Sequence, residues 1–239
     1  RSVGKACNTG RTLATAPSGG ERVVEPVSDF PRPYPLQFQG SRLARGLLAL
    51  AGWKVRFEGL PALQGVLVVY PHTSNWDFVV MILAKWAVGV PVRFWGKDRL
   101  FRIPLFGRWL RWVGGVPVDR TAPRGVTAQA LEIFEQRRRA GRYFWLGLAP
   151  EGTRKYIPGL RSGFYRTALG AGVPLGLVRL DYAAREVRVL DFIALSGEAT
   201  IDLTRMNAAY DGIAGRVPGN AAPIRLLDAS VARADTIVK

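Results

Sequence analysis

The sequence predicts one α/β domain, with a mixed and mostly parallel sheet flanked by helices. Three observations support this prediction. The chain of 239 residues has the length of one ordinary domain. Runs rich in β-branched and aromatic residues alternate with apolar or amphipathic runs of helical length. Two charged loops directly follow strand-like runs, where ligands usually bind in open sheets.

Residues 1–40 are expected to form a flexible leader that ends in an extended arm lying on the domain. They are rich in Gly, Pro, Ser and Thr, they show no sustained hydrophobic period, and Pro31, Pro33 and Pro35 alternate near their end. We therefore place the folded domain at residues 41–228 and a short C-terminal tail at residues 229–239.

Residues 41–53 change in character and predict a helix. Ser41 is a suitable N-cap, and Leu43, Leu47 and Leu50 recur at helical spacing beside arginines. Two interpretations fit this pattern. The helix packs on the core of the domain, or it lies on an anionic lipid surface as an interfacial helix. The sequence alone leaves both open.

The elements that follow are predicted from their hydrophobic pattern. Residues 66–70 form a β-branched and aromatic run between Gly65 and Pro71, which is typical of a buried strand. By similar criteria, we expect strands at 91–96, 115–118, 143–149, 175–182 and 186–193, and helices at 78–88, 127–139 and 200–210. The last two strands are separated by only three residues, which predicts an antiparallel hairpin at one side of the sheet.

His72 is the only histidine of the chain, so we expect chemistry that needs an imidazole near neutral pH to occur there. It lies in a predicted strand-to-helix turn, in which Ser74 and Asp77 match a helix-capping pattern. Such a turn would let His72 and Asp77 meet, whereas residues five apart on a regular helix point in different directions. In the functional interpretation, Asp77 orients the imidazole, which takes a proton from a hydroxyl group. In the structural interpretation, Asp77 only caps the helix.

The strand-like run at 143–149 leads directly into a charged loop at residues 150–155 (PEGTRK). Gly152 would let backbone amides approach a bound oxyanion, and Thr153 adds a hydroxyl group. Arg154 offers a guanidinium group that can bind phosphate in a bidentate manner. These residues predict a phosphate site, and the alternative is an ordinary polar loop closed by a surface ion pair.

Residues 100–113 (LFRIPLFGRWLRWV) interleave large apolar side chains with Arg102, Arg108 and Arg111. Basic residues among aromatic ones suit a lipid headgroup interface or the entrance of an acyl-chain site. They also suit the stacking of single-stranded nucleic acid.

The composition limits the classes of partner. Lys and Arg total 34 against 18 Asp and Glu, and the formal charge of +16 favours nucleic acid, an anionic membrane or a phosphorylated substrate. One cysteine and one histidine argue against a structural metal site. The longest apolar run, residues 78–90, has 13 residues and includes Lys85, so it is too short for a spanning helix. We expect any membrane contact to be peripheral.

Four blocks, in this order and spacing, resemble the glycerophosphate and lysophospholipid acyltransferase family, which is typified by bacterial 1-acylglycerol-3-phosphate acyltransferases. The blocks are residues 72–77 (HTSNWD), 96–101 (GKDRLF) with Pro104, Gly107 and 115–120 (GVPVDR), 150–154 (PEGTR), and 172–178 (GVPLGLV). The resemblance covers about residues 41–227. Two positions depart from the family pattern: Ala149 stands where a phenylalanine usually precedes the third block's proline, and Leu177 replaces a second proline in the fourth block.

The resemblance implies a glycerophosphate-acyltransferase-like fold and an O-acyltransferase activity. A fatty acyl group would pass from acyl-CoA or acyl carrier protein to the free hydroxyl of a lysophospholipid, by family default 1-acyl-sn-glycerol 3-phosphate. His72 would be the base and Asp77 its orienting partner. The residues implied for the acceptor are Glu151, Gly152, Thr153, Arg154, Lys97 and Arg120.

The resemblance also implies no metal and no cofactor, and a peripheral position at the anionic cytoplasmic face of a bacterial membrane. The change at Ala149 is expected to shift the choice of substrate. Two alternatives stay open: another acceptor, such as a lyso-ornithine lipid or a glycolipid precursor, or a non-catalytic basic protein that binds membrane or nucleic acid. The second gives no reason for His72 and Asp77 to accompany residues 151–154, so we expect no nucleic acid partner.

Overall fold

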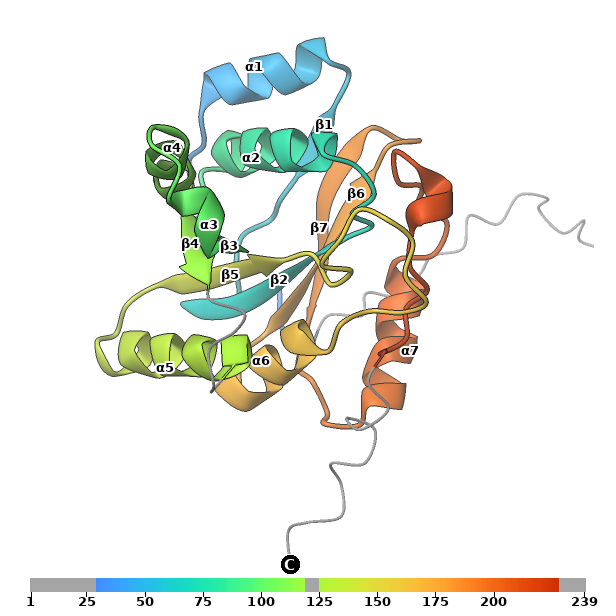
Figure 1. The fold of residues 1–239 in the computed structure, drawn as a ribbon. Coiled ribbons are helices and arrows are strands. Elements are labelled where there is room, and N and C mark those ends of the chain that lie inside the picture. Colours follow the sequence, from blue (N-terminus) through green and yellow to red (C-terminus); the bar gives the residue numbers. More distant parts are fainter. Residues whose placement is uncertain (1–28, 119–124, 228–239) are drawn as a thin grey trace, which may run out of the picture.

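The structure is a computed structural model that describes residues 29–118 and 125–227. These residues form three layers, with a sheet between two layers of helices (Figure 1). Among them, seven strands build one sheet in the order β1-β7-β6-β2-β5-β3-β4. The strands are β1 Lys54–Arg56, β2 Gln64–Tyr70, β3 Val92–Lys97, β4 Gly115–Val118, β5 Phe144–Leu148, β6 Leu175–Asp181 and β7 Glu186–Ile193.

The pairing of the strands is mixed. β6, β2, β5, β3 and β4 pair in parallel. β7 is antiparallel to β6 through the predicted hairpin, and β1 lies beside β7 in parallel. The predicted fold class, a single α/β domain with a mixed and mostly parallel sheet flanked by helices, is confirmed.

Helices cover both faces of the sheet. They are α1 Arg42–Leu50, α2 Trp76–Val88, α3 Asp98–Phe101, α4 Phe106–Trp112, α5 Gly125–Arg139, α6 Gly163–Ala171, α7 Ala199–Ala209 and the short 3-10 helix Pro218–Asn220. In Figure 1, α2 lies over one face with α1 outside it, while α5, α6 and α7 lie on the other face. In the part of the chain that the structure describes, no helix is both long and apolar enough to cross a membrane.

β2 is the central strand and connects the two cores. Its residues Val66 and Val68 are fully buried and face α6, whereas Leu67 packs on the α2 side. Burying one such side chain contributes about 1.5–3 kcal/mol to folding. Because both faces of β2 are covered, the run has no polar alternation, as the sequence pattern indicated. The core therefore holds the carboxyl ends of β2 and β5 side by side, and the two charged loops leave the sheet there.

The described part of the N-terminal arm packs on the domain. Tyr34 is buried, with its ring against Phe192 at a centroid distance of 5.0 Å. The backbone of Leu36 forms a bridge with Leu60. The arm thus closes one side of the core on the α2 face of the sheet.

Five elements were not expected from the sequence: β1, α6, the 3-10 helix, and the short helices α3 and α4 in the segment that was expected only to interleave arginines with apolar residues. β1 has only three residues, too few to show a period. α6 contains two glycines and begins at Gly163, so its helix propensity is weak, and burial of residues such as Phe164 and Tyr165 stabilises it instead. The 3-10 helix Pro218–Asn220 lies in the segment that was expected to be irregular.

Candidate active site

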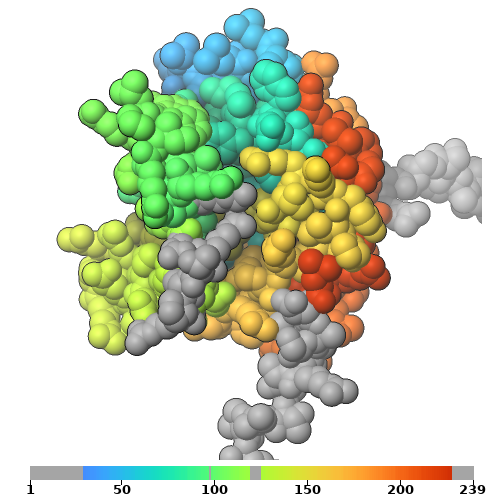
Figure 2. Space-filling view, in the orientation of Figure 1, coloured from blue at the N-terminus to red at the C-terminus, as the bar shows by residue number. Residues whose placement is uncertain are grey.

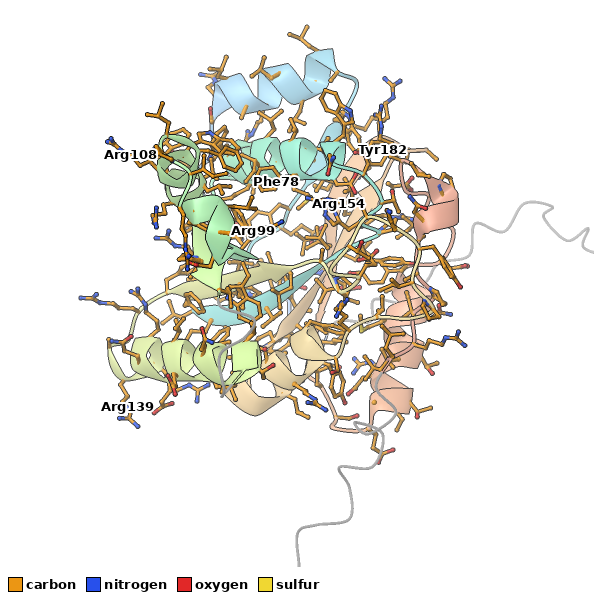
Figure 3. All side chains as sticks on the ribbon, in the orientation of Figure 1. Phe78, Arg99, Arg108, Arg139, Arg154 and Tyr182 are labelled. Atoms are coloured by element: carbon orange, nitrogen blue, oxygen red, sulfur yellow. The ribbon has the colours of Figure 1, made fainter. Side chains whose placement is uncertain are left out.

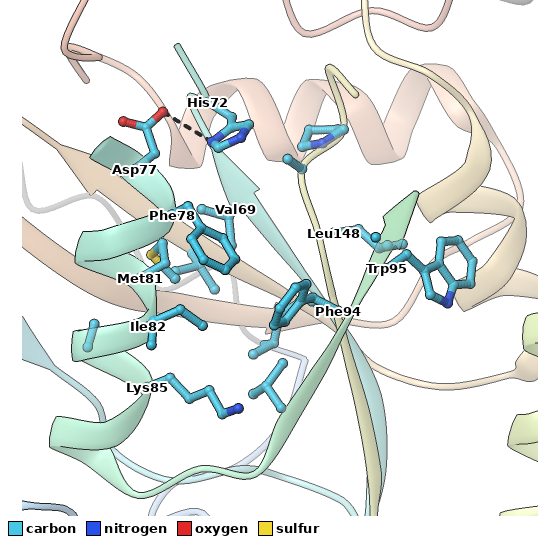
Figure 4. A pocket seen from close by; sticks show the side chains of 18 of the residues that line it. Val69, His72, Asp77, Phe78, Met81, Ile82, Lys85, Phe94, Trp95 and Leu148 are labelled. Carbon is cyan, nitrogen blue, oxygen red and sulfur yellow. Dashed lines mark ion pairs between the residues drawn. The ribbon is translucent and has the colours of Figure 1, made fainter. Parts of the chain in front are cut away.

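The turn after β2 brings His72 and Asp77 into contact. The Nδ1 atom of His72 lies 3.1 Å from Oδ2 of Asp77, as the dashed line in Figure 4 marks. The same oxygen accepts the backbone N–H groups of Thr73 at 2.7 Å and Ser74 at 2.8 Å. The turn is therefore folded around the carboxylate of Asp77, which is contacted by two backbone N–H groups and by the imidazole.

The second oxygen of Asp77 is also satisfied. Tyr182, which directly follows β6, donates its hydroxyl to Oδ1 at 2.8 Å. Asp77 is completely buried, and burial alone would raise its pKa. The hydrogen bonds from His72, Ser74 and Tyr182 outweigh burial, so the pKa of Asp77 is lowered below its ordinary value. Asp77 is thus ionised at neutral pH, and a neutral His72 that donates Nδ1–H to it keeps Nε2 as a proton acceptor.

The start of α2 differs in one detail from the predicted cap. The helix begins at Trp76, so its N-cap is Asn75 and not Ser74, and the Oγ of Ser74 accepts the N–H of Trp76 at 3.2 Å. The carboxylate of Asp77 still reaches back to the N–H of Ser74. The two interpretations of Asp77 are therefore compatible, because one oxygen contacts both the turn and the imidazole.

Glu151, which the family resemblance assigns to the acceptor, is held inside the protein beside the His72 turn. Its side chain is completely buried, and its Oε1 accepts the backbone N–H of His72 at 2.7 Å. Its Oε2 has no hydrogen-bond partner within the described residues. Burial is the largest influence and raises the pKa of this carboxyl group. Through the hydrogen bond to the N–H of His72, Glu151 ties the loop after β5 to the His72 turn.

The rest of that loop faces the cavity. Gly152 has a φ of +65°, a conformation that residues with a Cβ atom rarely adopt, and its N–H is engaged with the carbonyl of Ala149 at 3.1 Å. Thr153 is half-buried and its hydroxyl accepts the N–H of Lys155. The guanidinium of Arg154 is exposed and has no hydrogen bond or ion pair to another described residue. Arg154 is thus a free cation of this loop that lines the cavity and can bind an anion.

A cavity of about 820 Å³ joins these groups. It has His72 and Asp77 at one end and runs along α2, past Phe78, Met81 and Ile82, to Lys85 (Figure 4). The lining is mostly apolar, with side chains from β2, β3 and β5 opposite the helix. Gly152, Thr153 and Arg154 line the same cavity. The arrangement therefore places a base, a cation and an apolar channel in one continuous space.

Three further residues of the site carried no sequence signal or a weak one. Arg99 and Arg161 line the cavity with Arg154, and the Arg161 side chain passes so close to Gly152 that a Cβ there would lie 2.9 Å from its Cδ. Arg99 belongs to α3 and Arg154 to the loop after β5 (Figure 3), and Figure 2 shows these green and yellow segments on the same face. Tyr182 could have been found, because it follows a parallel strand at the same edge as both loops.

Lys97 and Arg120 are the remaining residues that the family resemblance assigns to the acceptor. Lys97 is the last residue of β3, which brings its backbone to this edge of the sheet. Arg120 lies outside the described residues.

The far end of the cavity holds an unexpected cation. Lys85 lies on the inner side of α2, and its Nζ donates to the backbone carbonyl of Val113. Burial, with a smaller contribution from the nearby Arg93, lowers the pKa of Lys85 to about 8. The lysine that interrupts the apolar run in the sequence thus lies among apolar cavity residues.

The fold and the cavity define the class first: an α/β domain with a histidine–carboxylate pair at the polar end of a deep apolar cavity. The model of the Acyltransferase family matches residues 53–176, which is more than half of the chain. The chain belongs to this family, and the resemblance noted in the sequence is confirmed.

Among solved structures, the chain is similar to the 1-acyl-sn-glycerophosphate (LPA) acyltransferase PlsC from Thermotoga maritima. The two are 21% identical, with a TM-score of 0.46 over 71% of this chain and 74% of that chain. No curated protein matches this chain.

Proposed function

We propose that the protein transfers a fatty acyl group from an acyl thioester to the free hydroxyl of a lysophospholipid. The acceptor is 1-acyl-sn-glycerol 3-phosphate, and the product is phosphatidic acid. One observation carries the proposal: His72, Asp77 and Arg154 line the same apolar cavity. Membership of the Acyltransferase family supports the type of reaction.

The chemistry follows from the orientation of His72. Its Nε2 takes the proton of the acceptor hydroxyl, and the resulting alkoxide attacks the thioester carbonyl carbon. The C–O bond forms and the C–S bond breaks. The leaving thiolate recovers the proton from His72, so the base is regenerated. Asp77 keeps the imidazole oriented and stabilises its charged form during the step. The proposed reaction uses no metal and no cofactor.

In this proposal the acceptor phosphate and the acyl chain bind to different parts of the cavity. Arg154 binds the acceptor phosphate through its free guanidinium, with Arg99 and Arg161 adding positive charge. The acyl chain lies in the apolar channel along α2. Lys97 and Arg120 are assigned to the phosphate by family resemblance alone, and acyl-CoA and acyl carrier protein are both kept as donors.

We also propose that an anionic membrane surface delivers the lipid substrate. Leu43 and Leu50 on the outer side of α1 are 74% and 87% exposed, and Trp112 at the end of α4 is 72% exposed. Exposed arginines such as Arg42 and Arg108 lie on the same two helices. Apolar side chains beside cations match the interface of an anionic bilayer, where each cation contributes about 1 kcal/mol.

The proposed reaction is tested with purified protein and a panel of substrates. Labelled acyl-CoA and acyl carrier protein thioester are each offered with 1-acyl-sn-glycerol 3-phosphate, a lyso-ornithine lipid or a glycolipid precursor, and products are read by mass. We expect phosphatidic acid as the main product. Transfer to a phosphate-free acceptor at equal rate would replace the proposed acceptor, and no transfer to any acceptor would reject the enzyme assignment.

The membrane proposal is tested in parallel. Sedimentation with vesicles that contain anionic phospholipid is compared with sedimentation with neutral vesicles and with binding to DNA, each over a salt series. We expect anionic vesicles to bind the protein and the double variant Leu43→Ser, Leu50→Ser to bind them at least tenfold more weakly. Binding to DNA without binding to vesicles would favour the non-catalytic alternative.

A further inference from the structure

The segment 214–227, which lies beyond the residues matched by the family model, contacts the His72 turn. Gly215 is buried against the turn, and a Cβ atom at this position would lie only 2.7 Å from Oγ1 of Thr73. Two residues later, the N–H of Val217 donates to the same Oγ1 at 3.2 Å. The segment is therefore packed directly on the residue that follows His72.

The same segment also contacts the loop after β5. Asn220, the last residue of the 3-10 helix, donates its Nδ2 to the backbone carbonyl of Arg154 at 2.9 Å. Farther on, Leu160 donates its N–H to the carbonyl of Arg225 at 2.6 Å and accepts the N–H of Leu227 at 2.9 Å. Residues 214–227 thus hold the segment after β5 at two points, Arg154 and Leu160.

These contacts form a closed path of hydrogen bonds and backbone segments that connects His72 with Arg154. The N–H of His72 binds Glu151, the chain continues to Arg154, and the carbonyl of Arg154 binds Asn220. The chain then leads back through Val217 to Thr73, the neighbour of His72. Each link is a hydrogen bond or a few residues of backbone, so the base and the cation are held relative to each other by a closed path.

We propose that residues 214–227 form a clamp that sets the position of Arg154 relative to His72, with Asn220 as a positioning residue for binding of the acceptor phosphate. The proposal rests on the acyl transfer proposed above. Within the described residues the guanidinium of Arg154 has no partner of its own, so its place is set by the backbone that carries it. Asn220 holds that backbone at its carbonyl group.

The expected effect is modest and specific. One neutral hydrogen bond has a small net effect, which corresponds to about a three- to tenfold change in affinity. Because Asn220 acts through Arg154, its loss raises the KM for a phosphorylated acceptor and leaves the KM for the acyl donor unchanged. A phosphate-free acceptor such as a monoacylglycerol is affected less, so the preference for phosphate falls.

The experiment compares Asn220→Leu, which keeps the size but removes the donor, with Asn220→Gln, which keeps an amide. Asn207→Leu is the matched control, because Asn207 is an exposed asparagine on α7, outside the segment 214–227 and both loops. For each variant, kcat/KM is measured with phosphorylated and phosphate-free acceptors. The Asn220→Leu change is then repeated in an Arg154→Ala background to complete a double-mutant cycle.

We expect Asn220→Leu to lower the phosphate preference three- to tenfold, Asn220→Gln to restore part of it, and Asn207→Leu to leave it unchanged. In the Arg154→Ala background, Asn220→Leu should have no further effect. An equal loss with both acceptors, or an additive loss in that background, would overturn the clamp and indicate a merely structural role. Wild-type protein that transfers no acyl group would instead reject the proposed function.

Discussion

Asp77 lies in the first turn of α2 and Glu151 in the loop after β5, each just beyond one of two neighbouring parallel strands, and neither side chain is exposed to solvent. Asp77 receives hydrogen bonds on both oxygens, and its pKa is lowered. Glu151 receives a hydrogen bond from His72 on one oxygen only, and burial raises its pKa. The comparison shows that burial raises the pKa of both carboxyl groups, and that the number of hydrogen-bond donors decides whether this effect is outweighed.

The two segments also differ in how firmly they hold their functional side chains. The turn after β2 is folded around an ionised carboxylate and fixes the imidazole before any substrate arrives. The loop after β5 is fixed by the side chain of Glu151 and by the backbone carbonyl of Arg154, while the Arg154 side chain stays free. The molecule thus combines a rigid group for chemistry with an adaptable group for binding.

The largest expected effect is at the base itself. His72→Ala should lower kcat by at least about 10²–10⁴-fold, because proton transfer from the acceptor hydroxyl loses its base. The fold should persist, since the His72 side chain is partly exposed and lines the cavity. Acyl transfer is measured beside the melting temperature. Full activity in a folded variant would remove the proposed mechanism.

The second effect tests the well-satisfied carboxylate. Asp77→Asn should lower kcat about 10–10³-fold and stability by about 2 kcal/mol, because several donors lose a charged acceptor. The lowered pKa means that the ionised form contributes stability above the ordinary pKa of 3.8, and this stability is lost as pH falls through the folded-state value. Chemical unfolding of both proteins between pH 3 and 7 checks this. Equal acid sensitivity would contradict the assigned role of Asp77.

The smallest effect tests the poorly satisfied carboxyl group. Glu151→Gln keeps an oxygen for the N–H of His72 and removes a buried charge, so kcat should change less than about tenfold. Because the folded-state pKa of Glu151 is raised, its ionisation reduces stability as pH rises from the ordinary value of 4.5 through the folded-state value. In Glu151→Gln, stability should no longer decline over this pH range, as chemical unfolding at several pH values would show. A clear loss of stability at neutral pH would show that the charge itself is needed.

Much of the fold was predictable because its signals are local. Strands buried on both faces, such as β2, appear as continuous apolar runs, and the helix after His72 carries a capping pattern. The sequence did not predict α6, because tertiary packing stabilises it, or β1, because it is too short to show a period.

The candidate site was predictable only in part. The spacing of His72 and Asp77 within one turn indicated their contact. The environment of Glu151 could not be predicted from the sequence, because burial and the number of donors depend on chain segments distant in sequence. Asn220 illustrates the same limit, since it lies 66 residues from Arg154 in the chain. Hydrogen bonds of this kind follow from topology and leave no local pattern.

Lys85 has a consequence for the whole molecule. Its pKa of about 8 in the folded chain lies below the ordinary 10.5, so folding at pH 9 expels a proton from this amine. Between these two values the unfolded chain binds more protons, and alkaline solution therefore favours the folded form. The native state should accordingly resist denaturant better at pH 9 than at pH 7.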